Sequence, residues 1–299
     1  MHSGPNRRPR HEDPDRRHHP KAKPRPIHKG KAPSTSPKQV THWGGVAQWY
    51  DKLVGDEGSE FQREVVLPGV VRLLGLKPGE TCVDVACGQG VLCRMLADRG
   101  VTMTGIDAAA PLIAAAKARL DAESGVSIDY RVADARELDF LPEASFDAAA
   151  CVLAIQNINP INPVFNGVAR ALKPMGKLAI VMMHPAFRGP KETHWGWDDQ
   201  AGVQFRRVDR YLLPRKTPII THPGSDPDTY TWSFHKPIES YVRALRGAGL
   251  LVDAIEEWPS HKNSTSGPRA AAENTARKEI PMFMAIRALK VLGGRMVEE

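Results

Sequence analysis

The chain has 299 residues, of which 41% are hydrophobic and 25% charged, proportions close to the average of globular proteins. A chain of this size forms one large domain or two small ones. No run of about eighteen uncharged apolar residues occurs, so we expect no membrane span, and no apolar stretch follows the basic N-terminus as a secretory signal requires. Four cysteines do not make a disulfide framework in so long a chain, which favours a reducing, cytoplasmic location.

The basic charge is concentrated at the N-terminus. Residues 1–40 hold six Arg and five Lys against three acidic residues, a net charge of +8; the whole chain carries +7, which leaves −1 for residues 41–299. The segment also contains eight Pro and five His, and it lacks the apolar side chains needed to offset the entropy of ordering. We predict a disordered basic tail, which is either a solubilising extension or an arm that binds RNA, DNA or another polyanion.

Residues 41–299 are predicted to form one domain. After a helix over residues 60–76, strands and helices take turns from about residue 80 to residue 183, as in a doubly wound, mostly parallel α/β sheet. The predicted strands are 81–86, 101–107, 126–134, 146–154, 176–184, 250–258 and 281–291. The further predicted helices are 90–100, 111–123, 162–173 and 236–250, and residues 259–280 are expected to be a polar loop.

Residues 185–236 interrupt this alternation directly after the fifth strand. They are polar and rich in Pro, yet they hold eight aromatic residues. One interpretation is an irregular insertion with a small core of its own. The other is a lid over a substrate, because ligands of such sheets bind at the carboxyl ends of the strands and lids exclude water from the reaction.

The first strand leads into the stretch Asp84-Val85-Ala86-Cys87-Gly88-Gln89-Gly90. A metal site is disfavoured, because Cys82, Cys87 and Cys93 are spaced by five and six residues without a CxxC pair. A nicotinamide or flavin loop of the GxGxxG type stays open, with Cys93 at the third glycine position.

The same stretch resembles motif I of the class I S-adenosylmethionine-dependent methyltransferases, with Ala86 where Gly is usual. Gly88 and Gly90 remove Cβ atoms where the backbone turns sharply against a ligand. The carboxylate of Asp84 suits a cofactor with cationic amino and sulfonium groups. The resemblance covers roughly residues 45–290 and implies a seven-stranded Rossmann-like sheet with S-adenosylmethionine as the cofactor.

Four further motifs carry this resemblance. Asp107, followed by Ala108, closes the second strand seventeen residues after Gly90, where the family places the acid that binds the ribose hydroxyls. NAD enzymes place an acid similarly. The pair Asp134-Ala135 is similar to the family's adenine-binding pair, and Phe146–Ile158 resembles the fourth-strand motif, which implies that Val152 and Leu153 lie beside the methionine moiety. The turn Lys173-Pro174-Met175-Gly176 resembles the turn into the family's fifth strand, with Met175 replacing a glycine, and Arg277–Lys290 is similar to the final strand.

Two aromatic or basic residues complete the predicted site. Tyr50 is expected either to fold over the cofactor, as the N-terminal aromatic does in similar methyltransferases, or to pack a helix. His184 ends the fifth strand and is our candidate for a general base, with His222 and His235 behind it. A base is needed only when the acceptor must lose a proton, and a structural role is the alternative for His184.

The stretch Asn162-Pro163-Val164-Phe165 is similar to the N-P-P-[YF] motif of adenine-N6 DNA methyltransferases, which hold a flipped base. It lacks the second proline. We therefore predict a helix start, with Asn162 as N-cap, Pro163 as first helical residue and Phe165 in the core.

The sequence thus predicts an S-adenosylmethionine-dependent methyltransferase without a metal site. A small-molecule acceptor is favoured because residues 41–299 are nearly neutral and the insertion is aromatic. Alternatives are an RNA or protein methyltransferase that uses the basic tail, a non-catalytic binding module with a cofactor fold, and a nicotinamide oxidoreductase.

Overall fold

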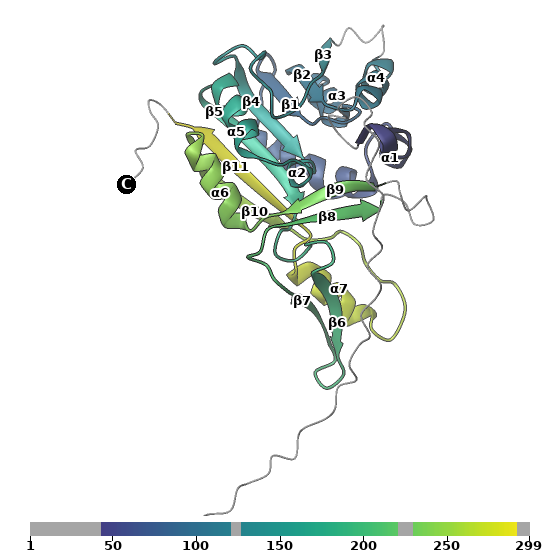
Figure 1. The fold of residues 1–299 in the computed structure, drawn as a ribbon. Coiled ribbons are helices and arrows are strands. Elements are labelled where there is room, and N and C mark those ends of the chain that lie inside the picture. The colour runs from purple at the N-terminus through teal and green to yellow at the C-terminus, as the bar shows by residue number, and fades with distance from the viewer. Residues whose placement is uncertain (1–42, 121–126, 221–229, 292–299) are drawn as a thin grey trace, which may run out of the picture. The chain divides into compact units, whose positions relative to one another are not determined.

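A computed structural model describes residues 43–120, 127–220 and 230–291 (Figure 1). The predicted tail, residues 1–40, and His222 lie outside the described residues. The centre of the fold is a seven-stranded sheet. Its strands, in the order in which they lie side by side, are β10 (Leu250–Trp258), β11 (Phe283–Lys290), β5 (Leu172–Met183), β4 (Phe146–Val152), β1 (Thr81–Val85), β2 (Thr102–Asp107) and β3 (Ile128–Val132).

Five of these strands, β5, β4, β1, β2 and β3, run parallel to one another, and β11 is antiparallel to both β5 and β10. The strand order reverses at β1, so the carboxyl ends of β1 and β4 diverge on the two sides of a crevice where ligands of open α/β sheets bind. The predicted Rossmann-like, mostly parallel seven-stranded sheet is confirmed.

Helices cover both faces of the sheet. The first face packs against α2 (Leu67–Leu74), α3 (Val91–Ala97) and α4 (Ala110–Ala118). The second packs against α5 (Asn162–Ala171) and α6 (Ile238–Gly247). Successive residues of β4 serve opposite faces, because side chains alternate along a strand, which explains why this strand is apolar almost throughout.

Five shorter or more peripheral helical elements complete the helices of the described chain. They are η1 (Trp43–Val46), α1 (Ala47–Val54), the π-turn η2 (Gln62–Val66), η3 (Ile155–Asn157) and α7 (Ala270–Glu279). The prediction of a loop over residues 259–280 was wrong where α7 forms. Ala276 is the one buried residue of this helix, so its sequence carries no apolar stripe that would predict it.

Two antiparallel hairpins follow β5. They are β6 (Thr193–Asp198) with β7 (Val203–Val208), and β8 (Arg215–Ile220) with β9 (Tyr230–His235). The first packs on α7 through β7, and the second packs on η1 and η3 through β9, at the ends of the sheet strands (Figure 1). The sequence analysis predicted no strands here.

The start of α5 differs from the prediction in one detail. Asn162 is the first helical residue, Ile161 occupies the N-cap position, and no side chain caps the helix. Ile161 is buried in the core, so packing fixes this end of the helix. Phe165 is buried as predicted, with 1% of its surface exposed.

Candidate active site

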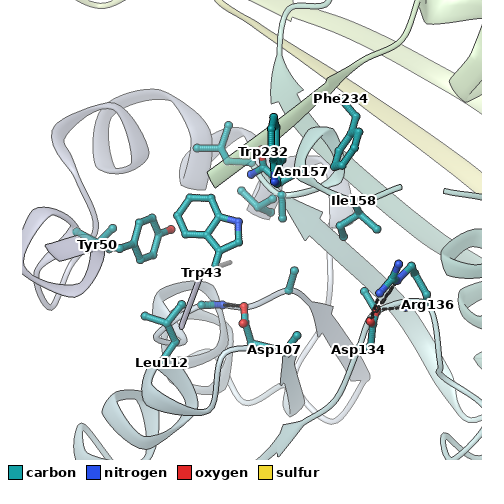
Figure 2. A pocket seen from close by; sticks show the side chains of 18 of the residues that line it. Trp43, Tyr50, Asp107, Leu112, Asp134, Arg136, Asn157, Ile158, Trp232 and Phe234 are labelled. Carbon is teal, nitrogen blue, oxygen red and sulfur yellow. Dashed lines mark hydrogen bonds and ion pairs between the residues drawn. The ribbon is translucent and has the colours of Figure 1, made fainter. Parts of the chain in front are cut away.

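A cavity of about 300 Å³ lies at the carboxyl ends of β1, β2, β3 and β4, with α1 and β9 completing its wall (Figure 2). Most of the residues predicted to bind the cofactor line this one cavity: Tyr50, Ala86, Gly88, Asp107, Ala108, Asp134, Ala135, Val152 and Leu153. Asp84 and Gly90 stand behind the lining. The cavity therefore collects residues from four strand ends that are distant in the sequence.

Asp107 joins two of the cavity's loops. Its Oδ2 accepts a hydrogen bond from the Gly88 amide at 2.9 Å, and its Oδ1 accepts one from the Ala109 amide at 2.8 Å. Burial raises the pKa of Asp107, and these two amides offset part of that effect. A carboxylate has about four lone-pair sites, so the two bonds leave acceptor capacity for hydroxyl groups of a ligand.

The backbone after β1 turns through left-handed conformations at Ala86, Gly88 and Gly90, with φ values of 60°, 58° and 79°. A Cβ at Gly88 would lie 3.3 Å from the Tyr50 ring. A Cβ at Gly90 would lie 2.1 Å from the hydroxyl oxygen of Tyr130. Gly88 therefore keeps the cavity open beneath Tyr50, whereas Gly90 allows α3 to start against β3.

Asp84 lies buried beneath this loop, with 2% of its surface exposed. Its Oδ2 accepts a weak hydrogen bond from the Cys93 thiol at 3.5 Å, and its Oδ1 is buried without a partner among the described residues. Burial raises the pKa of Asp84 to about 7; the Cys93 thiol opposes the rise and the charge of Asp107 adds to it. The buried carboxyl group of Asp84 and the half-buried one of Asp107 thus lie beside one loop, an environment that suits a cationic ligand group.

Asp134 is already paired within the cavity wall. Its Oδ1 accepts the Arg136 amide at 2.9 Å, and the Arg136 guanidinium binds both carboxylate oxygens. Burial alone would raise the pKa of Asp134, but the hydrogen bonds from Arg136 outweigh it and lower the pKa. Figure 2 shows this ion pair on the side of the cavity away from Tyr50.

Tyr50 projects from α1 into the cavity. Its ring packs edge-on against Trp43, with centroids 5.4 Å apart. Burial, followed by the negative charge of Asp107, raises the pKa of Tyr50 to about 12, so the hydroxyl stays protonated as a donor. Tyr50 and Trp43 line the cavity on the side away from Asp134 and Arg136 (Figure 2).

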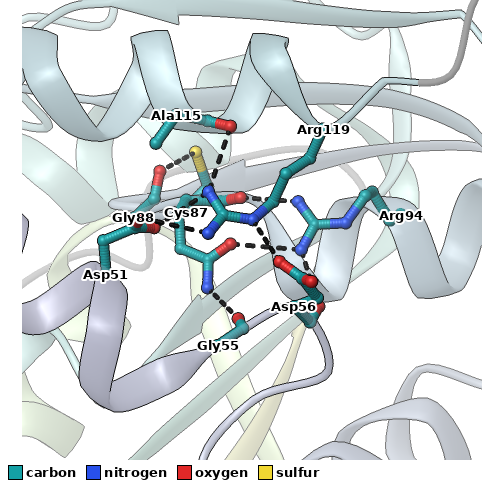
Figure 3. Close-up of polar contacts among 9 residues, drawn as sticks. Asp51, Gly55, Asp56, Cys87, Gly88, Arg94, Ala115 and Arg119 are labelled. Carbon is teal, nitrogen blue, oxygen red and sulfur yellow. Dashed lines mark hydrogen bonds and ion pairs between the residues drawn. The ribbon is translucent and has the colours of Figure 1, made fainter.

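A polar network fixes α1 in this position (Figure 3). Arg119, at the end of α4, donates to Asp51 at 3.0 Å and to Asp56 at 2.7 Å. Gln89, in the loop after β1, is buried and donates to the Gly55 carbonyl, and Arg94 donates to the Asp56 carbonyl at 2.8 Å. The helix that carries Tyr50 is therefore tied to the loop after β1 and to the end of α4.

A second cavity, of about 290 Å³, adjoins the first. The two linings share Trp43, Tyr50, Leu53, Leu153, Asn157 and Phe234. The rest of the second lining comes from α1, η3, residues 183–190, the hairpin β8–β9 and α6. His184 and His235 belong to this second cavity.

Both ring nitrogens of His184 are engaged. The amides of Ala186 and Phe187 donate to Nδ1 at 3.2 and 3.3 Å, so Nε2 carries the proton and donates to Glu257 at 2.7 Å. Burial lowers the pKa of His184, against the effect of Glu257. Neither nitrogen is placed to accept a proton from a bound molecule, so this geometry favours a structural role.

A doubly wound sheet with a glycine loop, an acid at the end of β2 and a cavity over both defines a nucleotide-type cofactor fold. A family model described as a methyltransferase domain matches residues 83–180. The ubiquinone biosynthesis O-methyltransferase of Xanthomonas axonopodis pv. citri (strain 306) is 36% identical over 193 residues, 63% of this chain and 72% of that protein. The chain belongs to the class I S-adenosylmethionine-dependent methyltransferases.

Two further proteins illustrate the similarity. The demethylmenaquinone methyltransferase of Tropheryma whipplei (strain Twist) is 31% identical over 187 residues, 62% of this chain and 63% of that protein. The crystal structure of an S-adenosylmethionine-dependent methyltransferase from Mesorhizobium loti superposes with a TM-score of 0.59 at 27% identity, covering 74% of this chain and 96% of that one. The cofactor is S-adenosylmethionine, and the unpartnered Asp84 oxygen together with the Cβ-free cradle at Gly88 fits such a group.

Several residues of the site were not predicted from the sequence: Trp43, Gln89, Arg119, Arg136, Asn157, Trp232 and Phe234. Arg136 directly follows the Asp134-Ala135 pair in the sequence, so its positive charge could have indicated an ion pair with Asp134. Within the described ranges, no cluster of three metal-ligating side chains is present, and no helix has the length and apolar character to cross a bilayer.

Proposed function

We propose that the enzyme methylates a small, mostly apolar acceptor that binds in the second cavity while the cofactor occupies the first. The observation that carries the proposal is the common wall of two cavities of nearly equal volume. Methyl transfer is an in-line displacement whose rate depends on alignment. Adjacent cavities that share lining residues would hold the donor and the acceptor side by side.

The predicted cofactor-binding residues that line the first cavity each receive a role in this proposal. Asp107 binds the ribose hydroxyls, and Asp134 with Ala135 borders the adenine. Ala108 continues the wall beside Asp107. Val152 and Leu153 lie beside the methionine moiety. When bound, S-adenosylmethionine supplies an electrophilic methyl group on its sulfonium sulfur.

The loop beneath the cofactor has two further tasks. Ala86, Gly88 and Gly90 shape the turn, and the charge of Asp84 favours the cationic amino and sulfonium groups from behind it. Tyr50 covers the cofactor and excludes water, a condition that strengthens electrostatic interactions inside the site. His184 holds the chain after β5 in place and is a positioning residue in this scheme.

The names of the relatives support a small-molecule acceptor. One is a ubiquinone biosynthesis O-methyltransferase and another a demethylmenaquinone methyltransferase. The second cavity is lined by Trp43, Trp49, Phe234 and Tyr241 among others, and an aromatic lining of this kind accepts a ring-shaped molecule. Residues 185–236 supply much of this wall, which supports a lid over the acceptor.

Calorimetry with S-adenosylhomocysteine tests the cofactor half of the proposal. We expect binding that Asp107→Ala weakens at least about 10-fold, since a hydrogen-bonded charged group contributes about 1.5–3 kcal/mol. Asp98→Ala removes an exposed carboxylate at the end of α3 that lines neither cavity and is the matched control. Equal affinities for the two variants would contradict the assigned cofactor site.

Deletion of residues 1–40 separates a small-molecule enzyme from one that acts on RNA or protein. We expect the truncated enzyme to keep its affinity for S-adenosylhomocysteine and its activity on a small acceptor. Loss of activity together with loss of salt-sensitive RNA binding would favour the macromolecular acceptor instead.

A further inference from the structure

The second cavity contains positive but no negative side chains among the residues that line it. Arg188 and Lys236 are its two cations, and its lining includes no Asp or Glu. His184 and His235 donate their Nε2 protons away to Glu257 and to the Tyr211 carbonyl. The fixed charge available to a bound molecule is therefore positive.

Neither cation has a carboxylate partner among the described residues. Lys236 donates to the Ile158 carbonyl at 3.3 Å and lies 5.3 Å from the centre of the Phe234 ring. Arg188 reaches the Ile280 carbonyl at 3.5 Å, and its Nε is buried without a partner. Burial lowers the pKa of Lys236 to about 8, and burial with the nearby charge of Arg206 lowers that of Arg188 to about 10.

Both cations are half-buried, and a partly desolvated cation without a counter-ion is costly to the fold. Groups whose pKa is perturbed in this way gather at functional sites. Four residues of the second cavity's lining also carry a buried polar atom without a partner among the described residues: Gln156 Oε1, Asn157 Oδ1, Arg188 Nε and Thr231 Oγ1. These atoms lie behind the surface of the wall, so the charge that a bound molecule meets is that of Lys236 and Arg188.

From these observations we propose that the acceptor is a flat ring with an anionic oxygen, a carboxylate or an ionised ring hydroxyl, bound by Lys236 and Arg188. The aromatic side chains hold the ring, and the two cations hold its oxyanion with charge-assisted hydrogen bonds. The inference rests on the proposed function, because it assigns a substrate class to the second cavity.

A matched pair of probes tests this class. 4-Hydroxybenzoate is anionic at pH 7 and 4-hydroxybenzamide is neutral, while ring and hydroxyl are the same. With S-adenosylhomocysteine saturating, calorimetry and the fluorescence of Trp43 and Trp49 report binding. We expect the anion to bind at least about 10-fold more tightly than the amide, which corresponds to about 1.4 kcal/mol.

Substitutions of Lys236 and Arg188 test whether these two side chains cause the preference for the anion. Lys236→Met keeps the apolar stem and removes the charge, so we expect the preference for the anion to fall to about twofold, and Arg188→Met to reduce it as well. Lys236→Arg keeps the charge and is expected to retain the preference. Lys278→Met, at an exposed site on α7 that lines neither cavity, is the control and is expected to match the parent enzyme.

Thermal unfolding and the affinity for S-adenosylhomocysteine establish that each variant is folded. Equal binding of the two probes, no binding of either at millimolar concentration, or an undiminished preference in a folded Lys236→Met variant would overturn the inference. If S-adenosylhomocysteine itself fails to bind the parent enzyme, the proposed function fails instead.

Discussion

The buried carboxyl group of Asp84 makes a prediction about stability that can be worked out from its environment. Its pKa is raised to about 7 in the folded protein from an ordinary value of 3.8. Between these two values the folded state keeps a proton that the unfolded state has lost. The unfolding free energy must therefore fall as pH rises through this window.

The magnitude follows from the width of the window. Each pKa unit corresponds to about 1.4 kcal/mol, and the shift spans about three units, so the loss approaches about 4 kcal/mol when the pH exceeds 7. Below 3.8 the group is protonated in both states and its contribution is fully present. Asp84→Asn removes the proton equilibrium, and the cost of burying an amide there does not change with pH.

We therefore expect the unfolding free energy of Asp84→Asn, relative to the parent protein, to rise by about 4 kcal/mol from about pH 4 to about pH 8. Urea titrations followed by circular dichroism and by tryptophan fluorescence measure both proteins across this range. Asp98→Asn removes an exposed carboxylate and serves as the control. A difference between parent and Asp84→Asn that stays within about 0.5 kcal/mol at every pH would refute the assigned environment of Asp84.

Three further changes test the polar network that holds α1, the glycine loop after β1 and the turn at the start of β5. Arg119→Met cuts the link between α4 and α1, and we expect an affinity for S-adenosylhomocysteine about fivefold weaker by calorimetry, because a partly buried ion pair contributes about 1 kcal/mol. Gly90→Ala places a Cβ against Tyr130 and should lower the unfolding free energy in urea by about 2–4 kcal/mol; Gly79→Ala, with a similar φ but open space, should cost about 1 kcal/mol. Met175→Gly should raise the unfolding free energy by about 0.5–1 kcal/mol, since Met175 has a φ of 62° and is 54% exposed; no change would show that the turn tolerates a side chain.

The sheet could be predicted because its strands are short apolar runs that alternate with amphipathic helices. Asp107 and Asp134 could be placed at strand ends for the same reason, since each directly follows such a run. The hairpin β6–β7 and α7 could not, because their side chains are largely exposed and their packing partners lie far away in the sequence. The role of Arg119 could not be predicted from the sequence, because Arg119 and Asp51 are distant in the sequence and meet only in the folded chain.

Comparison with the family's motifs also predicted two positions at which this chain differs from the usual glycine. Ala86 and Met175 stand where the family has glycine, and both adopt left-handed backbone conformations, with φ values of 60° and 62°. Each L-residue in this region costs roughly 1–2 kcal/mol. The sequence could predict the turns but not their strain, because φ depends on how the flanking elements pack.

The wall between the two cavities has a consequence for how the molecule can change over evolutionary time. The family model matches residues 83–180, which build most of the cofactor cavity, whereas the second cavity draws much of its lining from residues 183–190, residue 219 and residues 231–241. Under the proposed function, the donor and the acceptor are thus served largely by consecutive stretches of the chain. Substitutions of residues that line the second cavity alone would then retune the acceptor with little effect on the methyl donor, so relatives that share the earlier stretch could differ in what they methylate.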